Sequence, residues 1–375
     1  MRILYLATTV HLSTKMDDAI GASTHTLGLS NAFGELGHEV ILVTEKRFSN
    51  DRDKDTINGH KVYRFPRYIP TAVKKSRSGI KKYFKFLKNF PLFITSFKLM
   101  RVINKEKIDC IFCRSHTLKI GTLLAIILKK PLYLEVIDPI YTQIDAQKAK
   151  TIFAYTKGIF PEEFHKKIYL VTAGVDPAIF HPVNRKKTYD CVYIGAFKEW
   201  DGLEDIILAV KYLKGLHLEI KVLLIGDGVR RYSIEQLVSS NNLTDNIYFT
   251  GKVSLGSISK FASQAKIGIA PYNTRLSERG KFDQYGFYFS PLKVVEYLRM
   301  GLPVVSSNYP LIKKIITSNI GITYPPGNIK LLAESLVTLA NDKNLGKKGE
   351  DCLEKSEKYT WKKVAREMIS VMNKG

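Results

Sequence analysis

Residues 288–307, YFSPLKVVEYLRMGLPVVSS, are the stretch on which the fold depends. Ser290 is a residue type that caps helix N-termini, and Pro291 suits the first helical position. No helix breaker follows until Gly301, which we expect to end the helix because glycine adopts the left-handed conformation at little cost. Pro303 then opens a short apolar run typical of a buried strand. The stretch therefore predicts a helix with a fixed start that leads directly into a sheet.

The predicted start of this helix is suited to anions. The first backbone N–H groups of a helix lack intrahelical partners, and the helix dipole adds partial positive charge there. Lys293 adds a full charge in the first turn, and Glu296 shares its face because it lies three residues further on. A lysine beside a diphosphate and a carboxylate that accepts ribose hydroxyls suit a nucleotide sugar. An ordinary surface helix with a Lys–Glu ion pair explains the same residues equally well.

Length and composition limit the class of protein. A chain of 375 residues exceeds one ordinary core and favours two domains. The net charge of +23 indicates a polyanionic partner, which is nucleic acid, an anionic membrane or a phosphorylated substrate. Four cysteines are too few for a disulfide framework and fit a reducing cytoplasm. Cys110 and Cys113 have metal-pair spacing, but residues three apart on a strand face opposite sides, so we expect two buried apolar side chains.

Apolar runs alternate with amphipathic ones along the first half of the chain. Gly21 precedes the first amphipathic run, at the carboxyl end of a strand, where open α/β sheets bind ligands. The glycine pattern is not GxGxxG, so a dinucleotide cofactor is not favoured. The pattern predicts strands at 2–7, 39–44, 58–65, 108–113, 132–136 and 166–171, with helices at 24–36 and 118–129.

A polar stretch at 184–188 reads as a linker, after which the alternation starts again. Repeated strand–helix units with parallel strands predict a second Rossmann-like domain. Its expected strands are 190–194, 220–225, 247–250, 267–270, 304–306 and 321–324, and its expected helices, besides the one described first, are 202–213, 257–264 and 329–341, followed by an amphipathic C-terminal helix at 359–372.

Residues 74–107 hold eleven basic residues against one acid, Glu106, with six Phe and Tyr side chains among them. Basic, aromatic helices of this kind are typical of membrane-surface elements. A solvated helix that packs its aromatics on its own domain is the alternative, and nucleic acid could bind the same residues. We expect contact with an anionic membrane surface.

The order of the motifs resembles the retaining GT-B glycosyltransferases of group 1, glycosyltransferase family four, over nearly the whole chain. In the first half the match lies in the Gly21 loop and in GHEV at 37–40. At the domain junction it lies in GVD at 174–176, followed by Phe180 and Pro182. The second half adds GDG at 226–228, APY at 270–272, SPLK at 290–293, EY at 296–297 and GLPVV at 301–305. Together, in this order, these motifs are far more specific than any one alone.

The resemblance implies a GT-B fold of two facing Rossmann-like domains with parallel sheets and a C-terminal crossover helix. Residues 1–183 would bind the acceptor, with 359–375 packing back on them, and residues 184–358 would bind the nucleotide sugar. It implies a transferase that moves a sugar from a nucleoside-diphosphate sugar with retention. We expect no metal or other cofactor, because no Asp-x-Asp motif stands out at a strand end and a cationic cradle makes a divalent ion unnecessary. Lys293 and Glu296 would be catalytic. His116, near a strand end, is a further catalytic candidate of this sequence itself, and a surface or capping role explains it equally well. Donor binding is expected at Gly21, Gly195, Gly226, Lys252, Val253, Ser290, Pro291, Leu292, Lys293 and Glu296.

The sequence departs from the family pattern at several positions. Tyr288 stands where the family often has a second carboxylate, and Ala196 and Asp201 stand where it often has Arg and Lys. Ile137 stands where many members have His, and we expect His25 to be structural. The missing positive charge could come from Lys198, Arg279, Lys281 or Lys293.

The sequence alone leaves other functions open. A polyanion-binding protein on a GT-B scaffold and a GT-B sugar-nucleotide epimerase are the alternatives to the transferase. We expect a cytoplasmic protein peripheral to the inner face of the cell membrane, and a lipid-linked or membrane-proximal glycan as acceptor. These residues do not specify the nucleotide base of the donor, the sugar or the linkage.

Overall fold

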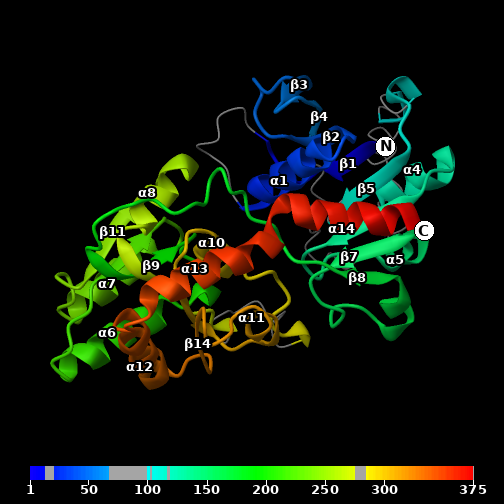
Figure 1. The fold of residues 1–375 in the computed structure, drawn as a ribbon. Coiled ribbons are helices and arrows are strands. Elements are labelled where there is room, and N and C mark those ends of the chain that lie inside the picture. The colour runs from blue at the N-terminus through cyan, green and yellow to red at the C-terminus, as the bar shows by residue number, and fades with distance from the viewer. Residues whose placement is uncertain (13–20, 67–98, 102–103, 116–118, 275–283, 375) are drawn as a thin grey trace, which may run out of the picture. The chain divides into compact units, whose positions relative to one another are not determined.

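The computed structural model describes residues 1–12, 21–66, 99–101, 104–115, 119–274 and 284–374. They divide into two α/β units (Figure 1), of which unit 1 comprises Met1–Thr172 and Ala365–Gly375, and unit 2 comprises Ala173–Val364. The boundary expected from the sequence, after residue 183, lies further along the chain than this division. Among the described residues, no helix combines the length and the apolar character needed to cross a membrane.

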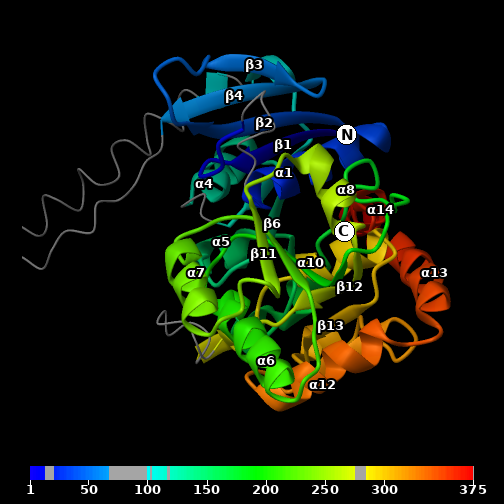
Figure 2. The ribbon, with the colours of Figure 1, turned by 90° about the vertical axis from the view of Figure 1, so that its left-hand side faces the viewer.

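The described strands of unit 1 form an eight-stranded sheet in the order β3-β4-β2-β1-β5-β6-β7-β8. Neighbouring strands are parallel except β3 and β4, which pair antiparallel at the edge shown at the top of Figure 2. The strands are β1 (Arg2–Ala7), β2 (Glu39–Lys46), β3 (Lys54–Ile57), β4 (His60–Pro66), β5 (Cys110–Arg114), β6 (Leu132–Val136), β7 (Thr151–Ala154) and β8 (Ile168–Leu170).

The first strand is central because it is almost wholly apolar. Tyr5 and its neighbours in β1 are fully buried, and the Tyr5 ring meets Phe112 of β5 edge-on at 5.0 Å. Strand order reverses beside β1, since β2 pairs on one side and β5 on the other. This is the switch point where open α/β sheets place ligands. Cys110 and Cys113 are buried free thiols, as their strand position predicts.

Helices of unit 1 are α1 (Gly21–Glu35), α4 (Ile120–Leu128), α5 (Gln143–Lys148) and the 3₁₀ helix η2 (Glu162–Lys167). The greater part of the C-terminal helix α14 (Trp361–Lys374) also belongs to unit 1. Tyr133 of β6 donates a hydrogen bond to the Met372 carbonyl at 2.9 Å, which fixes the end of α14 within this unit.

The six-stranded sheet of unit 2 has the order β11-β10-β9-β12-β13-β14, and all its pairs are parallel. Its switch point lies between β9 and β12. The strands are β9 (Tyr189–Ile194), β10 (Val222–Ile225), β11 (Ile247–Gly251), β12 (Ala265–Ala270), β13 (Val304–Ser307) and β14 (Gly321–Tyr324).

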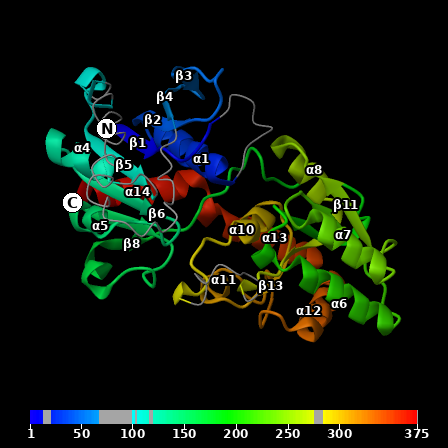
Figure 3. The same cartoon turned by 180° about the vertical axis from the view of Figure 1, so that it is seen from behind.

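Two apolar clusters, one containing residues of α6 and α12 and the other residues of α10, form the core of unit 2. Figure 3 shows α6 and α12 side by side, in agreement with their mutual packing. The α-helices are α6 (Leu203–Gly215), α7 (Arg231–Ser240), α8 (Ile258–Ala262), α10 (Leu292–Arg299), α11 (Pro310–Lys313), α12 (Ile329–Ala340) and α13 (Leu345–Ser356), and the 3₁₀ helices are η3 (Glu199–Asp201), η4 (Leu255–Ser257) and η6 (Glu357–Tyr359).

Several expectations about elements were wrong. The strand expected at 58–65 is present as β4, but it begins at His60 because Asn58 and Gly59 form a two-residue turn with positive φ, and its partner β3 was missed. Strand β7 and the polar helices α7 and α13 were missed. Ser290 does not cap α10 with its side chain; Pro291 is the N-cap residue, and the Ser290 hydroxyl accepts a hydrogen bond from the Ala173 backbone N–H at 3.1 Å. Gly301 does follow the helix in the left-handed conformation, with φ of 67°.

Candidate functional site

Lys293 lies in the first turn of α10 and reaches the carboxyl end of β9. A Cβ atom built on Gly195, directly after β9, would lie 2.5 Å from the Lys293 Cε. Its ammonium lies 5.3 Å from the ring centre of Tyr193 and 5.0 Å from that of Tyr272. Aromatic faces attract cations, so these two rings hold the charge beside the glycine.

Asp201 is the charged partner of this lysine. The Lys293 Nζ lies 2.7 Å from the Asp201 Oδ1, and the two side chains are 15% and 4% exposed. Asp201 ends η3, and the following Gly202 has φ of 69° and passes so close to the Pro271 carbonyl that a Cβ would lie 1.8 Å from its oxygen. This close passage fixes the backbone beside Asp201. Asp201 stands where the resembled family often has Lys, and here this acid binds a lysine supplied by α10.

The two strand-end glycines predicted to bind a donor lie against each other. A Cβ on Gly226, which follows β10, would lie 1.9 Å from the Gly195 carbonyl oxygen. Gly195 in turn donates its backbone N–H to the Ile225 carbonyl at 3.0 Å. The loops after β9 and β10 thus form a bare backbone edge, and Lys293 lies over it. Bare backbone of this kind allows a phosphate to approach closely.

Glu296 lies one turn further along α10 and is partly exposed. Burial raises the pKa of its carboxyl to about 7, although the Lys293 ammonium acts in the opposite direction. No hydrogen bond from a described residue reaches the Glu296 carboxylate. Since the Lys293 charge is shared with Asp201, the carboxylate retains its capacity to accept hydrogen bonds from a ligand.

Tyr272 is the second aromatic residue beside Lys293. It follows β12, is buried, and burial together with the charges of Asp201 and Glu296 raises its pKa well above the usual value. It therefore stays a neutral hydroxyl. Tyr193, Asp201, Tyr272, Lys293 and Glu296 come from β9, η3, the β12 end and α10, and they meet at the switch point of the sheet.

Other predicted site residues lie at different places. Lys198 is exposed and lies 5.3 Å from the Trp200 ring centre, in the loop that leads to Asp201. Lys252 is exposed and Val253 half-buried just after β11, and Val253 packs on the α10 core cluster. Tyr288, in the position of the absent second acid, is buried and meets the Phe289 ring edge-on.

Some predictions cannot be placed. His116, Arg279 and Lys281 lie outside the described residues. So do residues 74–98 and 102–103 of the basic stretch. Gly21 is described as the first residue of α1.

Unit 1 contains a buried polar cluster that the sequence did not reveal. His25 Nε2 lies 2.7 Å from the Glu135 Oε1, and the Tyr5 hydroxyl donates to the Glu135 Oε2 at 2.9 Å. Burial lowers the pKa of His25, while for Glu135 the neighbouring positive groups and accepted hydrogen bonds outweigh burial and lower the pKa. Arg114 donates to the Thr26 hydroxyl at 2.7 Å. His25 is enclosed with these groups, which favours the structural role expected from the sequence.

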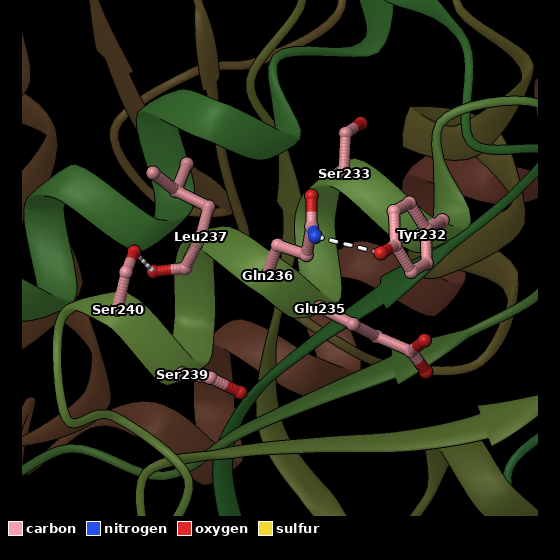
Figure 4. Close-up of a pocket in the computed structure, with 7 residues that line it drawn as sticks. All are labelled: Tyr232, Ser233, Glu235, Gln236, Leu237, Ser239 and Ser240. Atoms are coloured by element: carbon pink, nitrogen blue, oxygen red, sulfur yellow. Dashed lines mark hydrogen bonds between the residues drawn. The ribbon is translucent and has the colours of Figure 1, made fainter.

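A surface depression follows helix α7 (Figure 4). Gln236 donates to the Tyr232 hydroxyl at 2.8 Å, and Glu235 is paired with Arg231. All its lining residues come from this one helix, so no second element converges on a ligand there: Tyr232, Ser233, Glu235, Gln236, Leu237, Ser239 and Ser240. We do not assign function to it.

Within the described part of the chain, no group of three or more His, Cys, Asp or Glu side chains is arranged to hold a metal ion. The Asp201–Lys293 pair and Glu296 are charged groups that the fold gathers at the unit 2 switch point.

The family model described as glycosyl transferases group 1 matches residues 176–359. The matched segment covers just under half of the chain. It contains Gly195, Gly226, Asp201, Lys293 and Glu296, so these residues of the unit 2 cluster all lie inside it. A search of curated proteins found no match to the chain.

Solved structures resemble the chain over its full length. Sucrose-phosphate synthase from Thermosynechococcus elongatus has a TM-score of 0.73 at 17% identity, over 100% of this chain and 98% of that one. HepE from Anabaena in complex with UDP has a TM-score of 0.71 at 12% identity, over 100% of both chains. A TarM variant from S. aureus, in complex with fondaparinux, α-GlcNAc-glycerol and UDP, has a TM-score of 0.67 at 13% identity, over 99% of both. At these identities the likeness shows the fold, which is GT-B.

Proposed function

We propose that this protein transfers a sugar from a nucleoside-diphosphate sugar to a glycan acceptor, with retention at the anomeric carbon, as a member of glycosyltransferase family four. The observation that carries the proposal is the unit 2 cluster. In it, a lysine over bare glycine backbone shares one helix face with a carboxylate that has no hydrogen-bond donor among the described residues. HepE has been solved with UDP, with UDP-glucose and with UDP and glucose, which makes uridine nucleotides the first probes.

The chemistry follows from charge. A nucleoside diphosphate gains negative charge on its leaving oxygen in the transition state, and fixed positive potential stabilises it. Lys293 supplies that potential beside Gly195 and Gly226. Glu296, when ionised, accepts hydrogen bonds from the ribose hydroxyls. Lys198, Arg279 and Lys281 are candidates for a second cation, and His116 for a further catalytic group. We propose that no metal is needed, because a cationic cradle does the same work as a divalent ion.

Ligand binding and turnover test the proposal. Stabilisation by UDP, GDP and ADP sugars in a thermal-shift screen identifies the nucleotide, since ligands stabilise the state that they bind. Turnover should survive excess chelator, and proton NMR should show a product that keeps the donor configuration. Loss of activity with EDTA that magnesium restores would contradict metal independence. A product with inverted anomeric configuration would contradict retention. Consumption of the donor without an acceptor would indicate an epimerase or hydrolase instead.

Lys293→Ala should lower kcat by on the order of tenfold to a hundredfold, and the donor affinity less, because leaving-group charge grows in the transition state. Lys211→Ala, an exposed lysine of α6, is the matched control. An effect on the Michaelis constant alone would limit Lys293 to ground-state binding. The same kinetics on Arg279→Ala and Lys281→Ala would identify a second phosphate cation.

The acceptor side of the proposal concerns the membrane. We propose a lipid-linked or membrane-proximal acceptor, and a cytoplasmic protein held on the inner membrane face by residues 74–107. Each basic residue near an anionic surface contributes about 1 kcal/mol. Replacing Lys81, Lys82, Lys85 and Lys88 by Glu should abolish flotation with anionic liposomes at low salt. Unchanged flotation would remove these residues from the membrane contact.

A further inference from the structure

Helix α4 of unit 1 presents an apolar face to the outside. Leu123, Ile126 and Ile127 are 38%, 54% and 48% exposed, and their spacing places them on one side of the helix. We call these three residues the α4 face. The opposite side of α4 is buried on the sheet, so the core is already complete without them. Figures 1 and 3 show α4 at the outer edge of unit 1.

The α4 face is bounded by lysines and lacks acids. Helix α4, IGTLLAIIL, contains no charged residue, and Lys119 precedes it while Lys129 and Lys130 follow it. On the neighbouring helix α5, Asp145 is buried and accepts a hydrogen bond from Thr122 of α4 at 2.5 Å. This carboxylate is therefore turned inward, and lysines stand at both ends of the apolar side chains.

The lysine at the start of α4 does not serve the helix. Lys119 is the N-cap residue, with φ of 67° and no side-chain capping bond, and a positive charge there opposes the helix dipole. Lys129 is the C-cap residue, with φ of 52°, and its charge at that end favours the dipole. The unfavourable charge of Lys119 would be offset by an anion outside the helix.

We propose that the α4 face is a membrane-docking surface, which inserts its three apolar side chains into an anionic bilayer while Lys119, Lys129 and Lys130 pair with lipid phosphates. Apolar side chains flanked by lysines are the pattern that favours the boundary between headgroups and acyl chains. The net charge of +23 gives the whole chain the matching sign. A nucleic acid would pair with the lysines but would leave the isoleucines in water.

This docking surface is separate from residues 74–107 and does not depend on the glycosyltransferase proposal. Binding through charge alone weakens as salt screens it, whereas inserted apolar side chains remain bound. A protein that uses both surfaces should therefore keep part of its vesicle binding at high salt, and the α4 face should supply that part.

The test is flotation of the full chain with vesicles of phosphatidylcholine alone and of phosphatidylcholine mixed with phosphatidylglycerol, at low and at high salt. The combined Leu123→Ser, Ile126→Ser and Ile127→Ser variant should bind mixed vesicles about tenfold less than wild type and lose salt-resistant binding. The matched control replaces three exposed apolar residues of unit 2, Leu216, Leu218 and Val229, by Ser, and should float like wild type. Replacing Lys119, Lys129 and Lys130 by Gln should reduce the preference for anionic vesicles.

Folding and the rival occupant are checked separately. The α4 variant should keep the wild-type circular dichroism spectrum and melting temperature, which report the fold of unit 1 as well as unit 2, so a fold defect and a docking defect are distinguishable. In a second measurement, brominated lipid should quench the added fluorescence of Ile126→Trp. Wild-type flotation of the α4 variant, or absence of that quenching, would overturn the proposal. So would a wild-type dimer in light scattering that the α4 variant disperses, because the face would then bind a second copy.

Discussion

Two glutamates lie near the carboxyl ends of parallel strands, one in each unit, and their surroundings are opposite. Glu135 of unit 1 is 3% exposed and accepts hydrogen bonds from His25 and Tyr5. Those partners, with the Arg114 charge, outweigh burial and lower its pKa. Glu296 of unit 2 is partly exposed, has no hydrogen-bond donor among the described residues, and has its pKa raised by burial to about 7.

The difference distinguishes a structural carboxylate from a ligand-binding one. A buried carboxylate whose partners are all supplied by the protein stabilises the fold and has no capacity left for a ligand. A carboxylate that is desolvated without partners destabilises the free protein, and a ligand that donates hydrogen bonds to it removes that penalty. Both sheets have a switch point at which a ligand could bind, but only the unit 2 switch point leaves a carboxylate without hydrogen-bond donors among the described residues.

The largest expected effect is on stability, from Glu135→Gln. The amide removes the charge that His25 and Arg114 surround, and breaking a buried ionic network costs about 3–5 kcal/mol. Because the folded-state pKa of Glu135 is lowered, its contribution is full above the unfolded pKa and is lost as pH falls through the folded pKa. In urea unfolding, the free energy of unfolding of the variant should lie well below that of wild type at pH 8, and the difference should be smaller at pH 4. Equal stability at pH 8 would show that the network is not structural.

Glu296→Gln should raise the free energy of unfolding in the same urea assay, whereas Glu135→Gln lowers it. As pH rises from 4.5 to about 7, the unfolded chain releases the Glu296 proton while the folded chain retains it. The free energy of unfolding of wild type therefore falls as pH rises through that range. Glutamine lacks this loss, and the variant should be more stable than wild type at pH 8 by on the order of 2–3 kcal/mol, with no difference below pH 4.5.

Donor use should fall in this variant although its stability rises. Losing charge-assisted hydrogen bonds to the ribose should cost on the order of 2–3 kcal/mol in kcat/KM for the donor. In wild type, the Michaelis constant for the donor should rise as pH falls through about 7, because protonated Glu296 no longer accepts both hydroxyls. Donor turnover within a factor of about two of wild type would remove Glu296 from the site.

Local chemistry made much of the fold predictable. Apolar runs identified β1 and β6 with their observed ends, because a parallel strand buried on both faces needs no polar alternation. Polar helices α7 and α13 were missed because their exposed sides mask the apolar period. The Asn58-Gly59 pair was a visible hairpin signal that the single-strand prediction overlooked.

The candidate site was predictable only along one helix. Lys293 and Glu296 are three residues apart, so helical periodicity alone places them together. Asp201 is 92 residues from Lys293 in sequence, and Glu135 is 110 from His25, so only the tertiary fold brings each pair together. The capping prediction for Ser290 failed for a similar reason, since the hydroxyl accepts from Ala173, 117 residues away.

The smallest expected effect, and the one that divides two roles most sharply, is that of Asp201→Asn. Asp201 and a diphosphate oxygen both require the Lys293 ammonium, and the pair is sheltered enough for that competition to matter. Asparagine keeps the shape without the charge, so UDP should bind about tenfold more tightly, ~1.4 kcal/mol, by calorimetry. The melting temperature without ligand should fall, because Lys293 loses a partner, and saturating UDP should narrow that gap. Glu199→Gln, in the same short helix η3, is the control and should change neither quantity. Tenfold weaker binding would mean instead that Asp201 orients Lys293 toward the phosphates rather than competing with them, and the acid at this position would then be part of the cradle.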